Sequence, residues 1–239
     1  MVKDVVKAIE KEKEYLAYRE KGEQPYALVD AVKEYGFDEL SDYFSAKREY
    51  LLGQLTFKEW SAAPEDTVAT FFKMMKSGEP GFGISFIEKT FVWGGGSKPI
   101  NKDAAEEFGV PVYSLETVGG STVASPGDMS FGICVPTSLN VDMNFFLVKL
   151  KKIMSKYISN VEVINNDILV DGKKVCGATR YHHGNVFCFI AHFSFNSNPE
   201  LIDAICMTDK SLSVKTPGYI KGMSREDLSK EIRLWLKVQ

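Results

Sequence analysis

The sequence lacks several features that would point to a common functional class. Its 239 residues contain only four cysteines and three histidines, and no two cysteines are close in sequence. Structural zinc needs clustered ligands, so such a site is not expected. No apolar run is long enough to cross a bilayer, and the charged N-terminus lacks the apolar core of a signal peptide. We therefore predict a cytoplasmic protein with no membrane partner and with its cysteines as buried thiols.

The charge balance excludes a further class of partner. Lys and Arg number 29 against 32 Asp and Glu, which gives a net charge of -3. A general nucleic-acid binder carries a clear positive excess, so none is expected here. Hydrophobic residues make up 44% of the chain, which is enough to build a substantial core.

The residue pattern predicts an α+β protein with mixed or antiparallel sheets flanked by helices. Residues 1–37 predict an N-terminal helical extension, either a solvated cap or a partner-binding element, and residues 38–239 predict the main domain. Helices are expected near residues 39–54, 67–76, 101–109, 143–157, 198–207 and 224–238. Strands are expected near residues 82–93, 110–116 and 129–136, and a meander over 161–195 with a turn at Asp171-Gly172. Hairpins mixed with helices favour α+β over doubly wound α/β.

The first segment of chemical interest is the glycine-containing loop at 118–128. Gly119 and Gly120 allow the backbone to approach a ligand closely, and successive N–H groups in such a loop can bind an anion. The same pattern also fits an ordinary turn between two strands. The loop by itself does not decide between the two.

Two more segments lie in the predicted meander. In the hairpin 165–178, the pair Asn166-Asp167 begins one strand, and Lys173 and Lys174 begin the next. Strand pairing is expected to bring carboxylate and ammonium groups within a few residues of each other. An ordinary hairpin with a charged turn is the alternative. Farther along, the neighbours His182 and His183 face opposite sides of one strand, so at most one of them enters a given site.

Four segments follow one another between about residues 88 and 196. They are VWGGGSKPINKDAAEEFGVPV, GGSTVASPGDMSFGICVP, NNDILVDGKKVCGAT and HHGNVFCFIAHFSF. In this order and spacing they resemble the lipoate–protein ligase branch of the biotin/lipoate protein ligase family. The resemblance implies that family's catalytic-domain fold, with the first helix of the family's core at residues 41–52.

The resemblance also implies an activity. The family activates a carboxylic acid, such as lipoate, with ATP and Mg²⁺ as an acyl-adenylate, and passes the acyl group to a lysine of a lipoyl-type carrier protein. Carried over by position, Lys174 would be the catalytic residue that stabilises charge on the α-phosphate and acyl oxygens. Asp167 would also hold the metal. The residues that would bind nucleotide and acyl group are Gly119, Gly120, Ser121, Asn166, Asp167, His183 and Gly184.

The chain departs from the family pattern where phosphate would be bound. The family's glycine-rich loop usually begins with one or two arginines, but this chain has Leu115 and Glu116 there. A carboxylate has the wrong sign to replace an arginine at a phosphate. We expect Glu116 to turn outward or to pair with a cation such as Lys98. Two alternatives therefore stay open: an acyltransferase that uses a pre-activated acyl donor, and an inactive relative that binds a ligand or protein.

Overall fold

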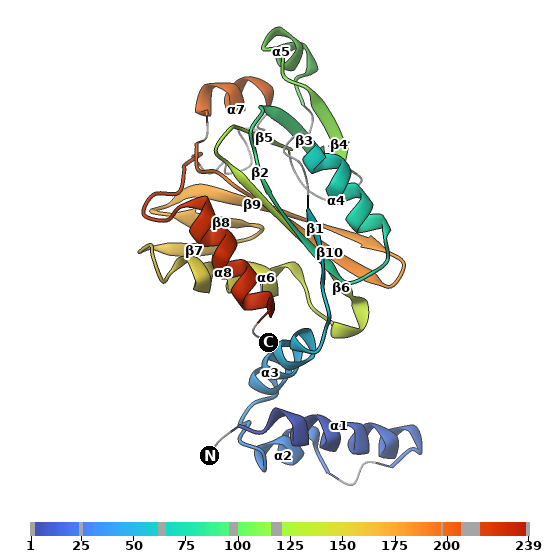
Figure 1. The fold of residues 1–239 in the computed structure, drawn as a ribbon. Helices are drawn as coiled ribbons and strands as arrows, with labels where there is room; N and C mark the ends of the chain where they lie inside the picture. Colours follow the sequence, from blue (N-terminus) through green and yellow to red (C-terminus); the bar gives the residue numbers. More distant parts are fainter. Residues whose placement is uncertain are drawn as a thin grey trace. The chain divides into compact units, whose positions relative to one another are not determined.

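The chain divides into two compact units, Met1–Leu55 with Lys237–Gln239, and Thr56–Leu236. A computed structural model describes residues 3–23, 26–61, 66–95, 100–115, 121–196, 198–206 and 216–237 (Figure 1). The two units are described separately below.

The first unit is helical. It contains α1 (Val5–Glu20), α2 (Leu28–Lys33) and α3 (Leu40–Gly53). Its apolar core comprises Ala8, Ile9, Val32, Phe37 and Tyr43. The predicted helical character of residues 1–37 is confirmed. The predicted division after residue 37 differs from the division into compact units, which falls after Leu55, because α3 contributes Tyr43 to the core of α1 and α2.

A buried carboxylate joins α1 to α3 inside this unit. Glu12 is only 6% exposed, and its Oε2 accepts a hydrogen bond of 2.7 Å from the Tyr43 hydroxyl. The same oxygen forms an ion pair with Lys47. A buried charge is tolerated when it is paired and hydrogen-bonded, so this network fixes the position of α3 against α1.

The second unit contains two β-sheets. The larger has the strand order β1-β2-β6-β10-β9-β8-β7, in which β1 is parallel to β2 and the other neighbours are antiparallel. Its strands are β1 (Lys58–Ser61), β2 (Gly81–Phe86), β6 (Met129–Pro136), β7 (Val161–Ile164), β8 (Asp167–Val170), β9 (Lys173–His183) and β10 (Val186–Phe193). The smaller sheet has the order β4-β3-β5, with β3 (Phe91–Gly95), β4 (Val112–Leu115) and β5 (Ser121–Ala124).

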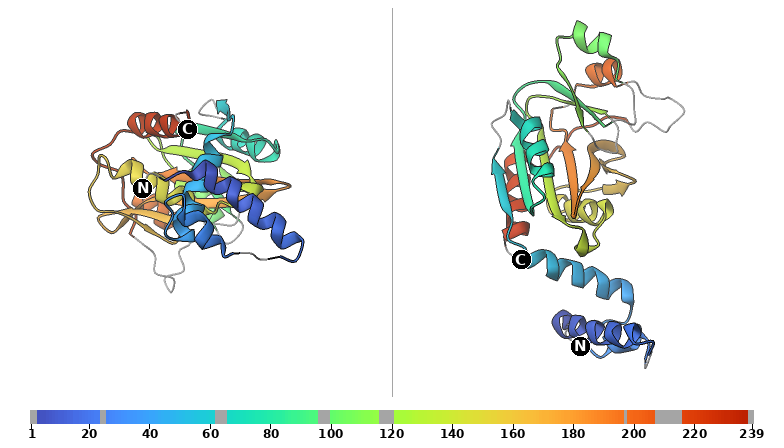
Figure 2. Two further views of the ribbon diagram at one scale, coloured as in Figure 1. Left: turned by 90° about the horizontal axis from the view of Figure 1, so that it is seen from below. Right: turned by 90° about the vertical axis from the view of Figure 1, so that its right-hand side faces the viewer.

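These sheets confirm the predicted α+β class and correct one element. The single strand expected over residues 82–93 is two strands, β2 and β3, which belong to different sheets. The turn expected at Asp171-Gly172 is confirmed, with φ of 49° and 74° at these residues. Near the smaller sheet, α5 (Lys102–Glu107) and α7 (Pro199–Ile205) lie side by side (Figures 1 and 2).

Helices pack on both faces of the larger sheet. On one face, α4 (Thr67–Lys76) presents Phe71 and Met74 to Gly132, where an added Cβ would lie 2.8 Å from each side chain. Neighbouring strand residues face opposite sides, so Phe131 belongs to the other face. There it contacts Trp235 of α8 (Arg225–Lys237), while Phe146 of α6 (Met143–Met154) lies beside the same tryptophan. The sheet therefore lies between two aromatic layers.

The cysteine prediction is wrong for two of the four residues. Cys134 and Cys188 are directly opposite in the β6–β10 register and form a disulfide, with Cα atoms 4.1 Å apart. Cys176 and Cys206 are buried, as predicted. Across the described ranges, no helix combines the length and apolar character needed to span a membrane. The cytoplasmic location stays a prediction.

Candidate functional site

The β8–β9 hairpin brings together the two charges that the sequence placed there. Asp167 begins β8 and Lys174 lies near the start of β9. The Lys174 Nζ is 2.9 Å from the Asp167 Oδ1, with side-chain exposures of 42% and 20%. The predicted proximity of the two charges is confirmed. Because the ammonium group is partly exposed, it can also reach a ligand outside the hairpin.

Gly177 makes room for this ion pair. It is the register partner of Asp167 across the hairpin. A Cβ added to Gly177 would lie 3.0 Å from the Lys174 Nζ and 3.1 Å from its Cε. The lysine side chain therefore lies directly across the glycine, and a larger residue would displace it. This contact gives a physical reason for the lysine and glycine spacing in the KVCG segment.

The backbone of Lys174 is held from a second direction by a distant segment. Its N–H donates to the Thr216 carbonyl at 3.0 Å, and its carbonyl accepts from the Gly218 N–H at 2.8 Å. An added Cβ at Gly218 would lie 2.7 Å from the Lys173 Cβ, so only glycine allows this approach. The sequence offered no signal for this pairing. Lys174 is thus fixed at its backbone and free to move only at its side chain.

A row of polar residues continues from the hairpin across the same face of the sheet. Gly177 is opposite His192 in β10, and His192 is opposite Ser130 in β6. His192 is 4% exposed, with Nδ1 3.1 Å from the Ser130 Oγ and Nε2 3.2 Å from the Asp128 Oδ2. Directly opposite residues point to one face, so the Lys174–Asp167 pair and this buried cluster share that face.

Asp128 is the centre of the buried cluster. Its carboxylate accepts backbone hydrogen bonds from Ser125 at 2.9 Å, Phe195 at 2.8 Å and Asn196 at 3.0 Å. Burial acts to raise the pKa of this carboxyl, but His192 and these N–H groups outweigh it, so the pKa lies below its usual value. An ionised Asp128 therefore ties the turn before β6 to the segment after β10.

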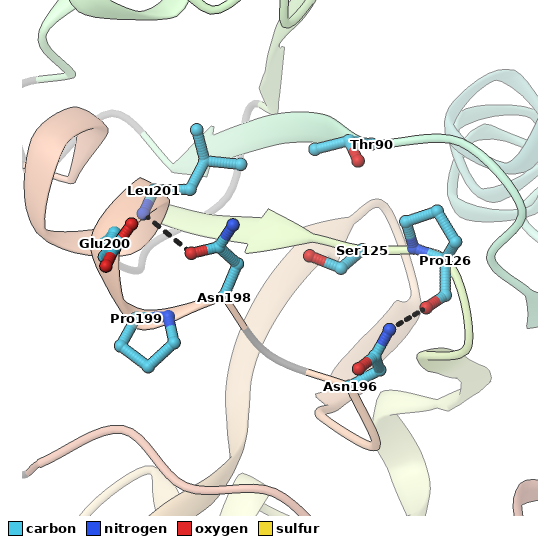
Figure 3. Close-up of a pocket in the computed structure, with 8 residues that line it drawn as sticks. All are labelled: Thr90, Ser125, Pro126, Asn196, Asn198, Pro199, Glu200 and Leu201. Carbon is cyan, nitrogen blue, oxygen red and sulfur yellow. Dashed lines mark hydrogen bonds between the residues drawn. The ribbon is translucent and has the colours of Figure 1, made fainter.

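These two segments form part of the wall of an open pocket of about 640 Å³ (Figure 3). Its described lining residues are Thr90, Ser125, Pro126, Asn196, Asn198, Pro199, Glu200 and Leu201. These residues come from short loops and the first turn of α7, whose packing no local pattern indicates.

The other predicted site residues are placed as follows. Ser121 begins β5, and its Oγ would lie 3.0 Å from a Cβ added to Gly94. Asn166 is exposed next to Asp167, and its carbonyl accepts the Ala178 N–H at 2.9 Å. The predicted ligand-binding pair Gly119 and Gly120, and the predicted orientation of Glu116 toward solvent or Lys98, fall outside the described residues.

His183 and Gly184 do not join Lys174. Both are exposed at the β9–β10 turn, where Gly184 has a φ of 54°. They lie nine and ten residues along the chain from Lys174, roughly 30 Å at the rise of a strand. His183 instead stacks against Tyr181 with ring centroids 6.1 Å apart. The structure therefore does not bring His183 and Gly184 together with Lys174, and their role in binding nucleotide or acyl group stays a prediction.

A metal ion at Asp167 would need further ligands from the residues around it. Among the described residues, no group of three or more His, Cys, Asp or Glu side chains is arranged to hold a metal ion. The Asp167 Oδ1 is already paired with the Lys174 ammonium, which repels a divalent cation. The described residues around Asp167 therefore do not fit a resident Mg²⁺, and no catalytic step below uses one.

Cys176, the neighbour of Gly177, is no nucleophile. Burial raises the pKa of its thiol, and the nearby Asp167 carboxylate adds to that effect. A protonated, buried thiol does not attack a substrate. Lys174 and Asp167 therefore remain the candidate functional groups of this hairpin.

The fold resembles solved lipoate protein ligase domains. P. falciparum LipL1 in complex with lipoate has a TM-score of 0.56 and 16% identity over 67% of this chain and 49% of its own. A bipartite lipoate protein ligase from Thermoplasma acidophilum, studied with its E2 lipoyl domain, has a TM-score of 0.53 and 15% identity. This match covers 78% of this chain and 82% of the ligase. Lipoate–protein ligase A bound with ATP has a TM-score of 0.54 and 13% identity, over 78% of this chain and 84% of its own. At these identities the likeness concerns the fold.

The chain spans about half the length of LipL1 and most of the length of the other two proteins. No curated protein gives a significant sequence match. The two-sheet α+β domain and its likeness to these solved structures define the fold class as that of a lipoate protein ligase. Residues 88–229, more than half of the chain, match the model of the lipoyl protein ligase A/B catalytic domain. The chain belongs to this family, as a divergent member.

Proposed function

We propose that this chain activates a carboxylic acid, such as lipoate, with ATP and transfers the acyl group to a lysine of a lipoyl-type carrier protein. The observation that carries the proposal is the Lys174–Asp167 pair, held across Gly177 at 2.9 Å within the segment that the family model matches. Of the related ligases named above, LipL1 was solved with lipoate, the T. acidophilum ligase was studied with a lipoyl domain, and lipoate–protein ligase A was solved with ATP. These ligands support the same ligand classes here.

The proposed chemistry has two steps. A carboxylate oxygen of the acid attacks the α-phosphorus of ATP, and pyrophosphate leaves. The acceptor amine then attacks the acyl carbon, and AMP leaves. Both steps develop negative charge on oxygens next to phosphorus or carbon, and a fixed ammonium group stabilises such charge. Lys174 fits this role because its backbone is anchored on Thr216 and Gly218 while its ammonium group remains partly exposed.

Asp167 is proposed to hold Lys174 in place before the substrate binds. The carboxylate orients the ammonium group over Gly177. When an anionic substrate arrives, the lysine can turn to it with little rearrangement. Mg²⁺ would then arrive with the nucleotide, held chiefly by its phosphates, as is common for this ion.

A second candidate function is supported by the absence of arginine. No arginine occurs between residues 88 and 179, which includes the glycine-rich loop. Arginine is the usual bidentate partner of phosphate, so this segment has no arginine side chain with which to bind a triphosphate. An acyltransferase that takes a pre-activated acyl donor needs fewer phosphate contacts. Lys174 would then stabilise only the oxyanion of the acyl-transfer step.

Pyrophosphate exchange into ATP with a panel of carboxylic acids tests the first function. We expect lipoate or a similar acid to support exchange, and Lys174→Ala to reduce the rate by about 10²-fold or more, as loss of an oxyanion donor does. Lys173→Ala is the matched control, because Lys173 is exposed and alanine keeps the Cβ atom that faces Gly218. No exchange with any acid, together with acyl transfer from a pre-activated donor, would favour the second function. Full turnover by Lys174→Ala would contradict both.

A further inference from the structure

A short segment of residues 216–220, here called the strap, lies beside the start of β9. The neighbouring strand β10 ends at Phe193. Beyond that point, the Ser194 N–H donates to the Val175 carbonyl at 2.9 Å, and the Ile220 N–H donates to the Ser194 carbonyl at 2.8 Å. The strap therefore continues the hydrogen bonding of β9 where β10 no longer supplies a partner.

The strap binds both backbone groups of Lys174. Lys174 and Pro217 form a parallel bridge, in which the Lys174 N–H donates to the Thr216 carbonyl at 3.0 Å and the Gly218 N–H donates to the Lys174 carbonyl at 2.8 Å. In such a bridge the N–H position of the central strap residue points away from β9. Proline suits that position because it has no N–H to leave unpaired.

Gly218 allows the strap to come this close. An added Cβ at Gly218 would lie 2.7 Å from the Lys173 Cβ, whereas its next contacts, 3.5 Å to the Val175 Cγ1 and 3.6 Å to the Lys173 Cδ, are ordinary. Both atoms of the close pair would be bonded directly to the backbone, so no side-chain rotation relieves the overlap. Ordinary contact between carbon atoms is about 3.5–4.0 Å, so the two backbones would have to separate by about 1 Å.

We propose that Gly218 is a positioning residue for Lys174. Gly218 touches no reacting group, and its role rests on the proposed function because Lys174 is the group that it places. The lysine is held at two ends, its backbone by the strap and its ammonium group by Asp167 across Gly177. A side chain at position 218 would move the first of these ends and with it the ammonium group.

Steady-state kinetics of the full chain test the proposal, in pyrophosphate exchange or in acyl transfer, whichever the unchanged protein performs. Gly218→Ala should lower kcat by up to about 10²-fold, the cost of misplacing a group by about 1 Å. KM should change little, because Lys174 acts on charge that develops in the transition state. In hydrogen exchange, the Lys174 amide should lose protection while the Ala178 amide, which donates to the Asn166 carbonyl, keeps it.

Two substitutions of Lys173 show whether the close contact is the cause. Lys173→Gly removes the Cβ that an added side chain at position 218 would meet, and Lys173→Ala keeps it. Adding Gly218→Ala should therefore be nearly silent in the Lys173→Gly protein and should still lower kcat in the Lys173→Ala protein. A general loss of folding would not depend on this single carbon atom.

The outcomes distinguish this inference from the proposed function. Full kcat in Gly218→Ala would overturn the inference and leave the ligase proposal standing. An equal fall in kcat in the Lys173→Gly and Lys173→Ala backgrounds would also overturn it, because Gly218 would then serve the fold alone. An unchanged protein that performs neither exchange nor transfer would overturn the proposed function, and the inference with it.

Discussion

Substituting Gly177 with alanine isolates the position of the Lys174 ammonium from the rest of the fold. The added methyl group would lie 3.0 Å from the Lys174 Nζ and 3.1 Å from its Cε. Ordinary contact between such atoms is about 3.5–4.0 Å, so the lysine side chain must move by several tenths of an ångström or swing away from Asp167. The backbone has no reason to move, because the crowded atoms are the far end of a flexible side chain.

The expected effects on stability and turnover therefore differ. Loss of the ion pair costs less than about 1 kcal/mol, because Lys174 is 42% exposed, and the change from glycine to alanine offsets part of it. Turnover should fall, and by about 10²-fold if the ammonium group swings away by roughly 1 Å or more. Urea unfolding measures the first quantity and pyrophosphate exchange the second.

A double variant shows whether the two residues act together. If Gly177→Ala acts through Lys174, the double variant with Lys174→Ala should be no slower than Lys174→Ala alone. Independent, multiplying effects on the rate would refute this reasoning. So would a Gly177→Ala protein that unfolds, or one that keeps full turnover.

Three further predictions concern other parts of the chain. Asp128→Asn should lower the free energy of unfolding by about 3 kcal/mol, because it removes a buried, hydrogen-bonded charge. The folded pKa of Asp128 lies below the unfolded value of 3.8, so this contribution is present above that pH and lost below it. Urea unfolding of the two forms should converge in acid, and a constant gap would contradict the assignment. A chain of residues 56–239 should melt more cooperatively than one of 38–239, which keeps α3 without its partners; the reverse order would count against two compact units. Glu116→Arg should strengthen ATP binding in a calorimetric titration, and unchanged or weaker affinity would mean that this loop does not face a phosphate.

The elements that the sequence predicted well have strong local patterns. The helix expected over 67–76 matches α4, because Phe71 and Met74 recur at helical spacing and face the sheet. The hairpin followed from the Asp171-Gly172 turn, whose positive φ suits these residues. The proximity of Lys174 and Asp167 followed from the same hairpin. Its short turn brings residues that are close in sequence opposite one another on the two strands.

What the sequence did not predict depends on contacts between distant residues. Strand periodicity does not say which sheet a strand joins, so the change of sheet between β2 and β3 was missed. Cys134 and Cys188 are 54 residues apart and meet only because β6 pairs with β10. Asp128 and His192 are 64 residues apart in sequence and are also brought together by the pairing of β6 with β10. The pocket next to them was missed for the same reason.

Intact-mass analysis of an acceptor tests the central claim most directly. The full chain would be incubated with lipoate, ATP, Mg²⁺ and a lipoyl domain that carries its acceptor lysine. The account predicts that the domain gains the mass of one lipoyl group only when ATP is present, and that Lys174→Ala abolishes the gain while Lys173→Ala does not. An acceptor whose mass stays unchanged with both ATP and a pre-activated lipoyl donor would contradict it.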